Sequence, residues 1–307
     1  MPRLSVLIGT QNRHELLKRC LSGLANQTFR DVEIVVLDDG SENPVDEDVL
    51  AVYTGGLPVR CLLAEHPMGI AKGRNFLMIN ASGNLLCVLD DDAYFEDPHA
   101  LHRIVHTFEK RPEVGILAFK IIDYRYGLIR LLTPHSQHHL RKEAGVTDAR
   151  HYASYFLGGG HAIRKEVFLR CQGYSPHFFY GHEELDLSFK ALEAGFRIFY
   201  EPTIQAHHQP VPQKGATQHG AKQRERLFFH IRNRLFLAYQ HLPMPYLIVH
   251  VGVWLARYGV RALSQGALLT YFKAMWAGLT GLDNVTRTPI RKSTIGYLKA
   301  HFGRLWY

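Results

Sequence analysis

The 307-residue sequence lacks paired cysteines and any long apolar run. Its four cysteines, at positions 20, 61, 87 and 171, show no CxxC spacing, and three of them lie in apolar-periodic segments where a buried, reduced thiol is expected. This pattern favours a reducing compartment. The longest apolar tract, residues 246–256, is about half of the roughly 20 residues that a membrane-spanning helix needs. The sequence therefore predicts no transmembrane segment.

Two further absences narrow the class of protein. Residues 1–13 contain too short an apolar stretch for a signal peptide and are expected to begin with a strand, which predicts a cytoplasmic protein. The sequence shows no internal repeat and no low-complexity tract, which argues against a repeat fold and against disorder. With 46% apolar residues, the chain has ample material for a packed core.

Positive charge is in excess. The formal net charge is +8 and the isoelectric point is near 9.3. This balance suits an anionic partner such as a phosphorylated substrate, acidic lipid headgroups or nucleic acid, and does not choose among them.

The apolar pattern predicts an α/β fold. Short runs rich in Val, Ile and Leu predict buried parallel strands at residues 4–10, 33–38, 59–64, 85–90 and 114–122. Helical patterns lie between them, most clearly at 14–25 and 70–82. This alternation predicts a doubly wound, Rossmann-like and mostly parallel sheet with ligand sites at the carboxyl ends of the strands.

The second part of the chain is less regular. Residues 123–152 predict an irregular segment that lies over the ligand site at the carboxyl ends of the strands, and a strand-like segment follows at 154–165. A helix is expected at 184–194, and two short strands at 197–202 and 203–210. After about residue 222 the chain becomes basic and helical, which predicts a C-terminal helical extension. The expected domains are therefore residues 1–222, with a first half 1–122 and a second half 123–222, and residues 223–307.

Three consecutive acids, Asp90, Asp91 and Asp92, end the predicted strand 85–90. Like charges packed this closely raise one another's pKa or spread the loop apart unless a cation lies between them. Oxygen ligands suit Mg²⁺ or Mn²⁺, which commonly bind one or two carboxylates together with a substrate diphosphate. The alternative is a polar loop in which Asp97, before Pro98, caps the next helix, but this explains none of the triplet.

Polar motifs follow the other predicted strands at the same edge of the sheet. They read TQNR at 10–13, DDGS at 38–41 and GIAKGRN at 69–75, ahead of the aspartate triplet. In this order and spacing, residues 4 to about 210 resemble the family 2 inverting glycosyltransferases of GT-A fold, with rhamnosyltransferase-like members as the nearest pattern. Each motif is weak alone.

The resemblance implies a nucleotide-sugar site in the first half. It places Asp39 on the nucleotide base with Thr10, Asn12 and Arg13 beside it, although Thr10 and Asn12 are equally explained as turn formers. It places Arg74 and Asn75 at the ribose and diphosphate, whereas the alternative for Arg74 is an ion pair that neutralises the acids. The donor-binding residues expected from the resemblance are Thr10, Asn12, Arg13, Asp39, Arg74, Asn75, Asp90, Asp91, Gly159 and Arg232.

The resemblance also implies a metal site. Asp92 and Asp90 match the two acids of its D-x-D motif, so Asp92 is expected to bind Mn²⁺ or Mg²⁺ and Asp90 to contact the metal and the donor sugar, with Asp91 as the variable middle position. A histidine of the family often joins the metal, and spacing from Pro202 selects His208. Strand alternation puts His207 on the opposite face, and a structural histidine is an equally good explanation for either.

The catalytic base is expected near residue 184. By position in the family pattern it is Glu184, but this sequence has Glu where Asp is usual, so Glu183 and Asp186 remain candidates. Acids at the start of a helix also have a purely structural explanation, because they favour the helix dipole. The turn GGGHAIRK at 158–165 is expected to border the acceptor and donor sugar through Gly159, with a β-bulge as the alternative.

Basic helices close the sequence. The resemblance implies that Arg232 and Arg234, within 223–242, lie near the donor diphosphate. Residues 244–282 mix tryptophans and other aromatics with arginine and lysine, which suits a segment lying at an anionic membrane surface. The alternative is a helical packing unit or a dimer contact, which leaves room for a homo-oligomer.

Together these features predict an enzyme. It is expected to move a single sugar from a UDP- or dTDP-linked donor to a hydroxyl of a glycan or lipid-linked acceptor in cell-envelope polysaccharide synthesis, with inversion and without processivity. It is expected to be cytoplasmic and peripheral at the cytoplasmic face of the membrane. The alternatives are a silent sugar-nucleotide or glycan binder and a metal-dependent nucleotidyltransferase. Nucleic acid is not an expected partner, because a groove reader has no use for three adjacent aspartates.

Overall fold

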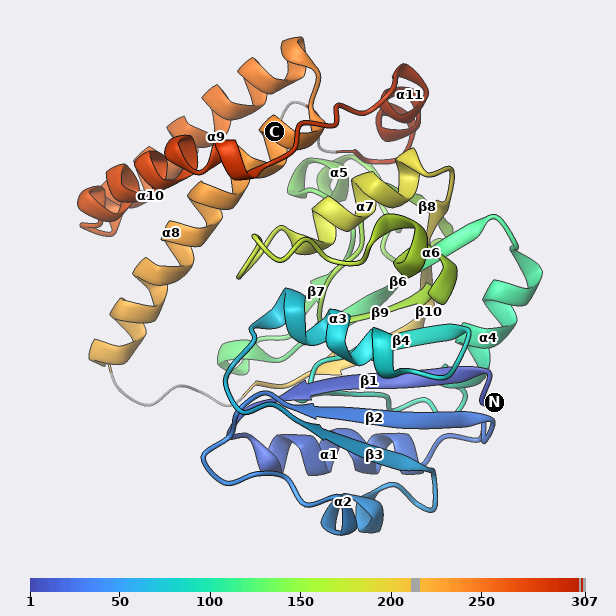
Figure 1. Cartoon of the computed structure of the whole chain (residues 1–307). Helices are drawn as coiled ribbons and strands as arrows, with labels where there is room; N and C mark the ends of the chain where they lie inside the picture. Colours follow the sequence, from blue (N-terminus) through green and yellow to red (C-terminus); the bar gives the residue numbers. More distant parts are fainter. Residues whose placement is uncertain (211–215, 304, 306–307) are drawn as a thin grey trace.

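A sheet sandwiched between helices forms most of the molecule, and an arm of C-terminal helices lies against one side of it (Figure 1). The computed structural model describes residues 1–210, 216–303 and 305. Among the helices of these residues, none is both long enough and apolar enough to cross a bilayer.

The sheet has ten strands in its described part, in the order β3-β2-β1-β4-β9-β6-β10-β5, with β7 on β6 and β8 on β10. Strands β1 to β4 are mutually parallel, and β9 runs antiparallel between β4 and β6. The strands are β1 (Leu4–Thr10), β2 (Val32–Asp38), β3 (Val59–Leu63), β4 (Leu85–Leu89), β5 (Ala93–Tyr94), β6 (Val114–Asp123), β7 (Arg130–Leu132), β8 (His151–Ala153), β9 (Gly160–Arg164) and β10 (Arg197–His208).

Helices cover both faces of the sheet. In β1, Val6 and Ile8 pack into a core with helices α1 and α4, while Leu7 packs into the opposite core with α3 and α7, as the alternation of a strand requires. The helices are α1 (His14–Ala25), α2 (Glu47–Tyr53), α3 (Ile70–Asn80), α4 (Ala100–Lys110), α5 (Gln137–Lys142), α6 (Lys165–Cys171), α7 (Glu183–Glu193), α8 (Ala216–His241), α9 (Met244–Ser264), α10 (Leu268–Thr280) and α11 (Lys292–Ala300), with short 3₁₀ turns at Arg125–Gly127 and Leu282–Asn284.

The structure confirms the doubly wound sheet and corrects its second half. The two short strands expected at 197–202 and 203–210 are one strand, β10, whose register against β6 shifts between Glu201 and Gln205. Pro202 lies in this shift, where the missing N–H costs no ladder hydrogen bond. The segment 123–152, expected to be irregular, contains β7, α5 and β8, and β8 pairs with β10.

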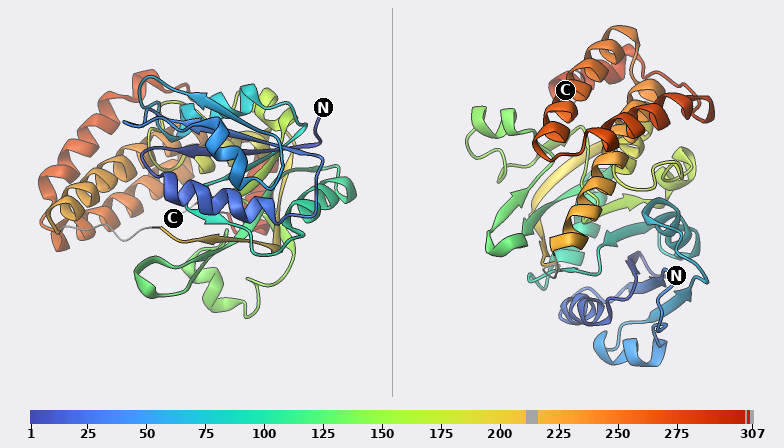
Figure 2. Two further views of the ribbon diagram at one scale, coloured as in Figure 1. Left: turned by 90° about the horizontal axis from the view of Figure 1, so that it is seen from below. Right: turned by 90° about the vertical axis from the view of Figure 1, so that its left-hand side faces the viewer.

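Three long helices form the arm seen in both views of Figure 2. Both α9 and α10 pack on α8, through a small core that includes Leu227, Ile231 and Ala274. Helix α11 returns to the sheet domain, where Tyr297 donates to the backbone of Ala153. Helix α8 begins at Ala216, a few residues before the expected boundary at 222, and the tail residues 304, 306 and 307 of the predicted basic segment lie outside the described residues.

Candidate active site and metal centre

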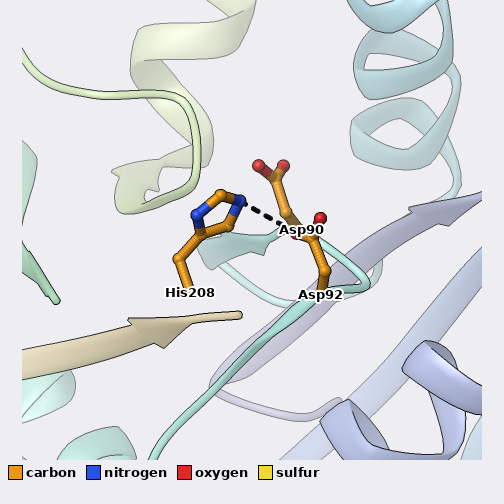
Figure 3. A group of neighbouring side chains, drawn as sticks. All are labelled: Asp90, Asp92 and His208. Carbon is orange, nitrogen blue, oxygen red and sulfur yellow. Dashed lines mark ion pairs between the residues drawn. The ribbon is translucent and has the colours of Figure 1, made fainter. Parts of the chain in front are cut away.

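Two aspartates and a histidine meet at the carboxyl edge of the sheet. Asp90 and Asp92 follow strand β4, and His208 ends strand β10 (Figure 3). One ligand atom from each lies within 4.8 Å of the others, and the Nε2 atom of His208 is 3.2 Å from Oδ1 of Asp92. In the described part of the chain, this is the one group of three or more His, Cys, Asp or Glu side chains placed to share a metal ion.

The orientation of His208 is fixed from behind by Asp123. Oδ1 of Asp123 lies 2.9 Å from Nδ1 of His208, which leaves Nε2 pointing at the two aspartates. Metal-binding histidines commonly carry such a carboxylate on their second nitrogen. Asp123 was not among the predicted site residues, although it ends strand β6 at the same edge of the sheet. Two oxygens and one oriented nitrogen therefore form a set that fits a divalent cation.

Arginine and histidine side chains offset the negative charge of this cluster. Burial opposes the charge on His208, but Asp92 and Asp123 outweigh it and raise the pKa of the imidazole. Burial also opposes the charge on Asp92, yet hydrogen bonds from His208 and Arg13 lower the pKa of this carboxyl. Asp90 lies 3.5 Å from Arg74, farther than Asp92 lies from Arg13, and burial raises the pKa of Asp90. A cation would need the neutral form of His208, so its binding is expected to weaken as the pH falls.

Asp91 points away from the cluster into the protein. It is 1% exposed, one of its oxygens accepts a hydrogen bond from Thr10 at 2.7 Å, and the other lies 3.2 Å from Arg13. Arg13 also donates to Asp92 at 2.9 Å. Burial raises the pKa of Asp91 to about 7. Thr10 and Asp91 thus hold Arg13 beside the cluster.

Two residues expected at the nucleotide hold neighbouring loops. Asp39 accepts the backbone N–H groups of Met68 at 2.7 Å and of Gly69 at 3.1 Å, which joins the end of β2 to the start of α3. Asn12 adopts a left-handed conformation with φ of 54°, and its side chain accepts the N–H of Glu42 at 2.8 Å. The turn-forming role of Asn12 is therefore present in the structure.

Arg74 joins the metal cluster to the acids of helix α7. Its guanidinium donates to Glu184 at 3.0 Å and to the carbonyl of Gly158 at 3.1 Å, and it lies 3.5 Å from both Asp90 and Glu183. The side chain is only 9% exposed. The ion-pair alternative considered for Arg74 is therefore what the structure contains, and a donor diphosphate would have to compete with these carboxylates.

Asn75 and Gly159, two more of the expected donor-binding residues, have different surroundings. Asn75 bonds both backbone groups of Tyr174 at 2.8 Å, so it holds the loop that precedes α7. Gly159 lies beside the cluster, where an added Cβ would be 3.3 Å from Oδ2 of Asp90. The structure therefore brings Gly159 to Asp90 and directs Asn75 toward the acceptor half.

The three acids of α7 have different surroundings. Asp186 is fully buried and bonded to Ser175 and His241, which stabilise its charge against burial and keep its pKa well below the usual range. Glu183 is also buried, and burial raises its pKa well above the usual range. The Glu184 side chain keeps 18% of its surface exposed. Glu184 is therefore the most accessible of the three.

The longer side chain of Glu184 fits because residue 158 is glycine. A Cβ added to Gly158 would lie 1.9 Å from Oε1 of Glu184 and 2.8 Å from a nitrogen of Arg74. The carboxylate thus passes directly over the glycine backbone. This close approach, and not a β-bulge, explains the first glycine of the GGG turn.

His207 and Arg232 contact residues outside the group of Asp90, Asp92 and His208. The ring of His207 stacks between Tyr94 and Tyr124, consistent with its opposite orientation along β10. Arg232 donates to the carbonyl of His177 at 2.8 Å and stacks on Phe229. Its guanidinium therefore holds the loop before α7.

Known proteins with similar sequences and similar structures are found. A β-1,3-glucosyltransferase of Campylobacter jejuni, described as GalNAc(5)-diNAcBac-PP-undecaprenol beta-1,3-glucosyltransferase, is 33% identical over 93 residues, which are 30% of this chain and 30% of that protein. The structure of mannosyltransferase PcManGT from Pyrobaculum calidifontis, in complex with GDP-Man and Mn²⁺, matches with a TM-score of 0.58 and 19% identity over 92% of this chain and 87% of that one. The structure of Staphylococcus aureus TarS 1–349 matches with a TM-score of 0.61 and 16% identity over 90% and 81%.

At these identities the structural likeness shows the fold, which is the GT-A fold that the motifs predicted. The family assignment rests on a sequence model. Residues 5–172, more than half of the chain, match the model described as "Glycosyl transferase family 2". The chain therefore belongs to glycosyl transferase family 2.

Proposed function

We propose that this glycosyltransferase moves one sugar from a UDP- or dTDP-linked donor to a hydroxyl of a glycan or lipid-linked acceptor, with inversion at the transferred carbon. One observation carries the proposal: the metal-binding group of Asp90, Asp92 and His208 is joined through Arg74 to a partly exposed carboxylate, Glu184. A glycosyl transfer in one displacement step requires a cation for the leaving group and a base for the attacking hydroxyl, and these two sites lie on either side of Arg74.

In this proposal the donor binds at the edge of the sheet. Asp90, Asp92 and His208 would hold Mn²⁺ or Mg²⁺, which would neutralise the charge that develops on the departing nucleoside diphosphate. Arg13 lies beside Asp92, where it can add a second positive charge for the diphosphate. Asp39 and Asn12 keep the loops around the nucleotide in place through their backbone contacts.

Glu184 is the proposed base. It would take the proton of the attacking hydroxyl at one of its carboxylate oxygens, and its longer side chain reaches the site over Gly158. Arg74 holds the carboxylate in place before the donor arrives. Asp186 anchors the start of α7 to His241 in α8, which fixes the direction of Glu184. No covalent nucleophile is needed, because attack opposite the leaving group inverts the anomeric carbon.

The wider setting is proposed from the relatives. The Campylobacter relative is named for an undecaprenol-linked acceptor, which supports a lipid-linked acceptor and a role in cell-envelope polysaccharide synthesis at the cytoplasmic face of the membrane. One structural neighbour was solved with UDP-GlcNAc, and another with GDP-Man and Mn²⁺. The sequence contains no Q-x-x-R-W string of the processive synthases, which supports one sugar per encounter.

A panel of nucleotide sugars tests the proposal. Each sugar is added to the full-length protein with Mn²⁺, Mg²⁺ or EDTA, and release of nucleoside diphosphate and the thermal shift are both measured. The expected result is metal-dependent release from one donor, lost in D92N. A thermal shift without release, in the presence of acceptor glycans, would indicate a silent binder. Pyrophosphate released from a nucleoside triphosphate would indicate nucleotidyl transfer.

A further inference from the structure

Helices α9 and α10 expose an unusual share of large apolar side chains. Of the 22 large hydrophobic residues that are exposed in the described part of the chain, ten lie between Met244 and Leu279. Scattered apolar residues are normal on a protein surface, but a concentration in two neighbouring helices marks a contact surface.

The exposed residues form one stripe along each helix, here called the α9–α10 stripe. In α10 the spacing of three and four residues puts Leu269, Phe272, Trp276 and Leu279 on one face, with exposed fractions of 69%, 59%, 72% and 56%. In α9 the corresponding residues are Val249, Val260 and Leu263, with the small residues Gly252 and Ala256 between them.

The opposite faces of both helices are already used. Tyr258 and Ala262 of α9 and Ala274 of α10 are buried in the core that they form with α8. The two helices are therefore apolar on both sides, one facing α8 and the other facing solvent. A surface helix of a protein without a further partner usually turns charged residues outward.

The charge around the stripe indicates which partner it fits. Residues 226–282 contain no Asp or Glu, and the exposed cations Arg257, Arg261 and Lys273 flank the apolar residues. A second copy of the chain would bring these cations together with no acid to balance them. An anionic bilayer instead accepts apolar side chains at its interface and attracts arginine and lysine at its headgroups.

The arm is also tied firmly to the site. In α8, Asn233 donates to the carbonyls of Tyr180 and Gly181 at 2.8 Å, and Arg232 donates to that of His177 at 2.8 Å. These carbonyls belong to the loop that runs directly into Glu183, the first residue of α7. Figure 1 shows α8 running beside α7 and carrying α9 and α10 outward. Helix α8 therefore links the stripe to the loop that precedes the α7 acids.

We propose that the α9–α10 stripe lies in the interface of an anionic lipid bilayer and holds Glu184 toward acceptors carried in that bilayer. The statement about acceptors rests on the proposed function, whereas the membrane contact itself does not. Neither helix crosses the bilayer. The helices lie along its surface, with Phe272 and Trp276 inserted and Arg257, Arg261 and Lys273 at the phosphates.

Vesicle flotation of the full-length protein tests the contact. The expected result is binding to vesicles of phosphatidylglycerol and phosphatidylcholine, weakened at least tenfold in F272S/W276S. The matched control is V52S/L169S, which removes two apolar residues of similar exposure, 78% and 65%, outside the stripe and should bind like the unmodified protein. R257Q/R261Q should lose the preference for phosphatidylglycerol over pure phosphatidylcholine.

Three outcomes would overturn the proposal: no flotation of the unmodified protein at low salt, equal flotation of F272S/W276S, or a dimer that F272S/W276S abolishes while vesicles are ignored. Release of nucleoside diphosphate from a soluble donor, measured on the same proteins, separates this inference from the proposed function. F272S/W276S should keep that rate, because α10 packs mainly on α8 and α9. A protein that floats but turns over no donor would refute the function and leave the membrane contact standing.

Discussion

Replacing Gly158 by alanine should disable catalysis while leaving the fold intact. A Cβ at this position would lie 1.9 Å from Oε1 of Glu184, so the oxygen would have to move by about 1.5 Å to reach an ordinary contact of 3.4 Å. Misplacing a reacting group by about 1 Å can cost roughly 10²-fold in rate. This corresponds to about 2.7 kcal/mol of activation free energy. We therefore expect kcat of G158A to fall by about 10²-fold.

Stability should hardly change in this variant. The φ of Gly158 lies outside the left-handed region, so alanine adds no backbone strain, and the atoms that it meets are the ends of two long side chains, Glu184 and Arg74. Thermal unfolding measured beside steady-state kinetics would show a shift of a few degrees at most. G296A is the matched control, because nothing lies within 4 Å of a Cβ added there in helix α11.

A double-mutant cycle sharpens the test. Shortening the acid in E184D withdraws the carboxylate by one carbon–carbon bond, roughly 1.5 Å, which is enough to clear the new methyl group. G158A should therefore cost about 10²-fold in the unmodified enzyme and little in the E184D background. Full activity of G158A, or equal losses in both backgrounds, would refute the placement of Glu184 as the base.

The remaining predictions concern the metal, the base and pH. D123N should weaken Mn²⁺ binding 10- to 100-fold in calorimetry, because His208 loses its orienting carboxylate. D92N removes a ligand and should weaken the binding further. Unchanged Mn²⁺ affinity in both variants would argue against a metal site. E184Q should keep the KM for donor and lose about 10²- to 10⁴-fold in transfer, and normal transfer would place the base elsewhere. Burial lowers the pKa of His135 from 6.5 to about 4 in the folded protein. As the pH falls, His135 is therefore protonated in the unfolded chain before it is protonated in the folded one. The associated stability, about 3 kcal/mol, is present above pH 6.5 and lost as pH falls toward 4. Chemical unfolding of H135N should show a shallower loss over this range, and an identical slope would contradict the assignment.

The carboxyl ends of the strands were predicted well from the sequence. Because Asp92 and His208 lie at these ends, their proximity could be predicted too. Parallel strands place their carboxyl ends at one edge, so motifs after β1, β2 and β4 had to converge. Asp123 escaped notice because it was assigned to the irregular segment after β6, and nothing in a single sequence shows that a strand continues one residue further.

The directions of adjacent acids were not predictable either. Which member of the triplet turns inward depends on the backbone of the turn after β4, and Asp91 turns inward toward Thr10 and Arg13. In the same way, Asp186 finds His241 on a helix more than fifty residues later in the chain. Hydropathy likewise located the apolar residues of α9 and α10, but only tertiary packing decides which face stays open.

The path of strand β10 has a consequence for the durability of the protein. Asp90 and Asp92 come from the first half of the sheet, whereas His208 arrives only after β10 has paired with β6, β8 and β5. An ion bound by all three residues would act as a reversible cross-link between segments that are distant along the chain. At a hundred times its dissociation constant, such an ion would add about 2.7 kcal/mol to the free energy of unfolding. Scarcity of the metal would then shorten the lifetime of the protein as well as slow its reaction.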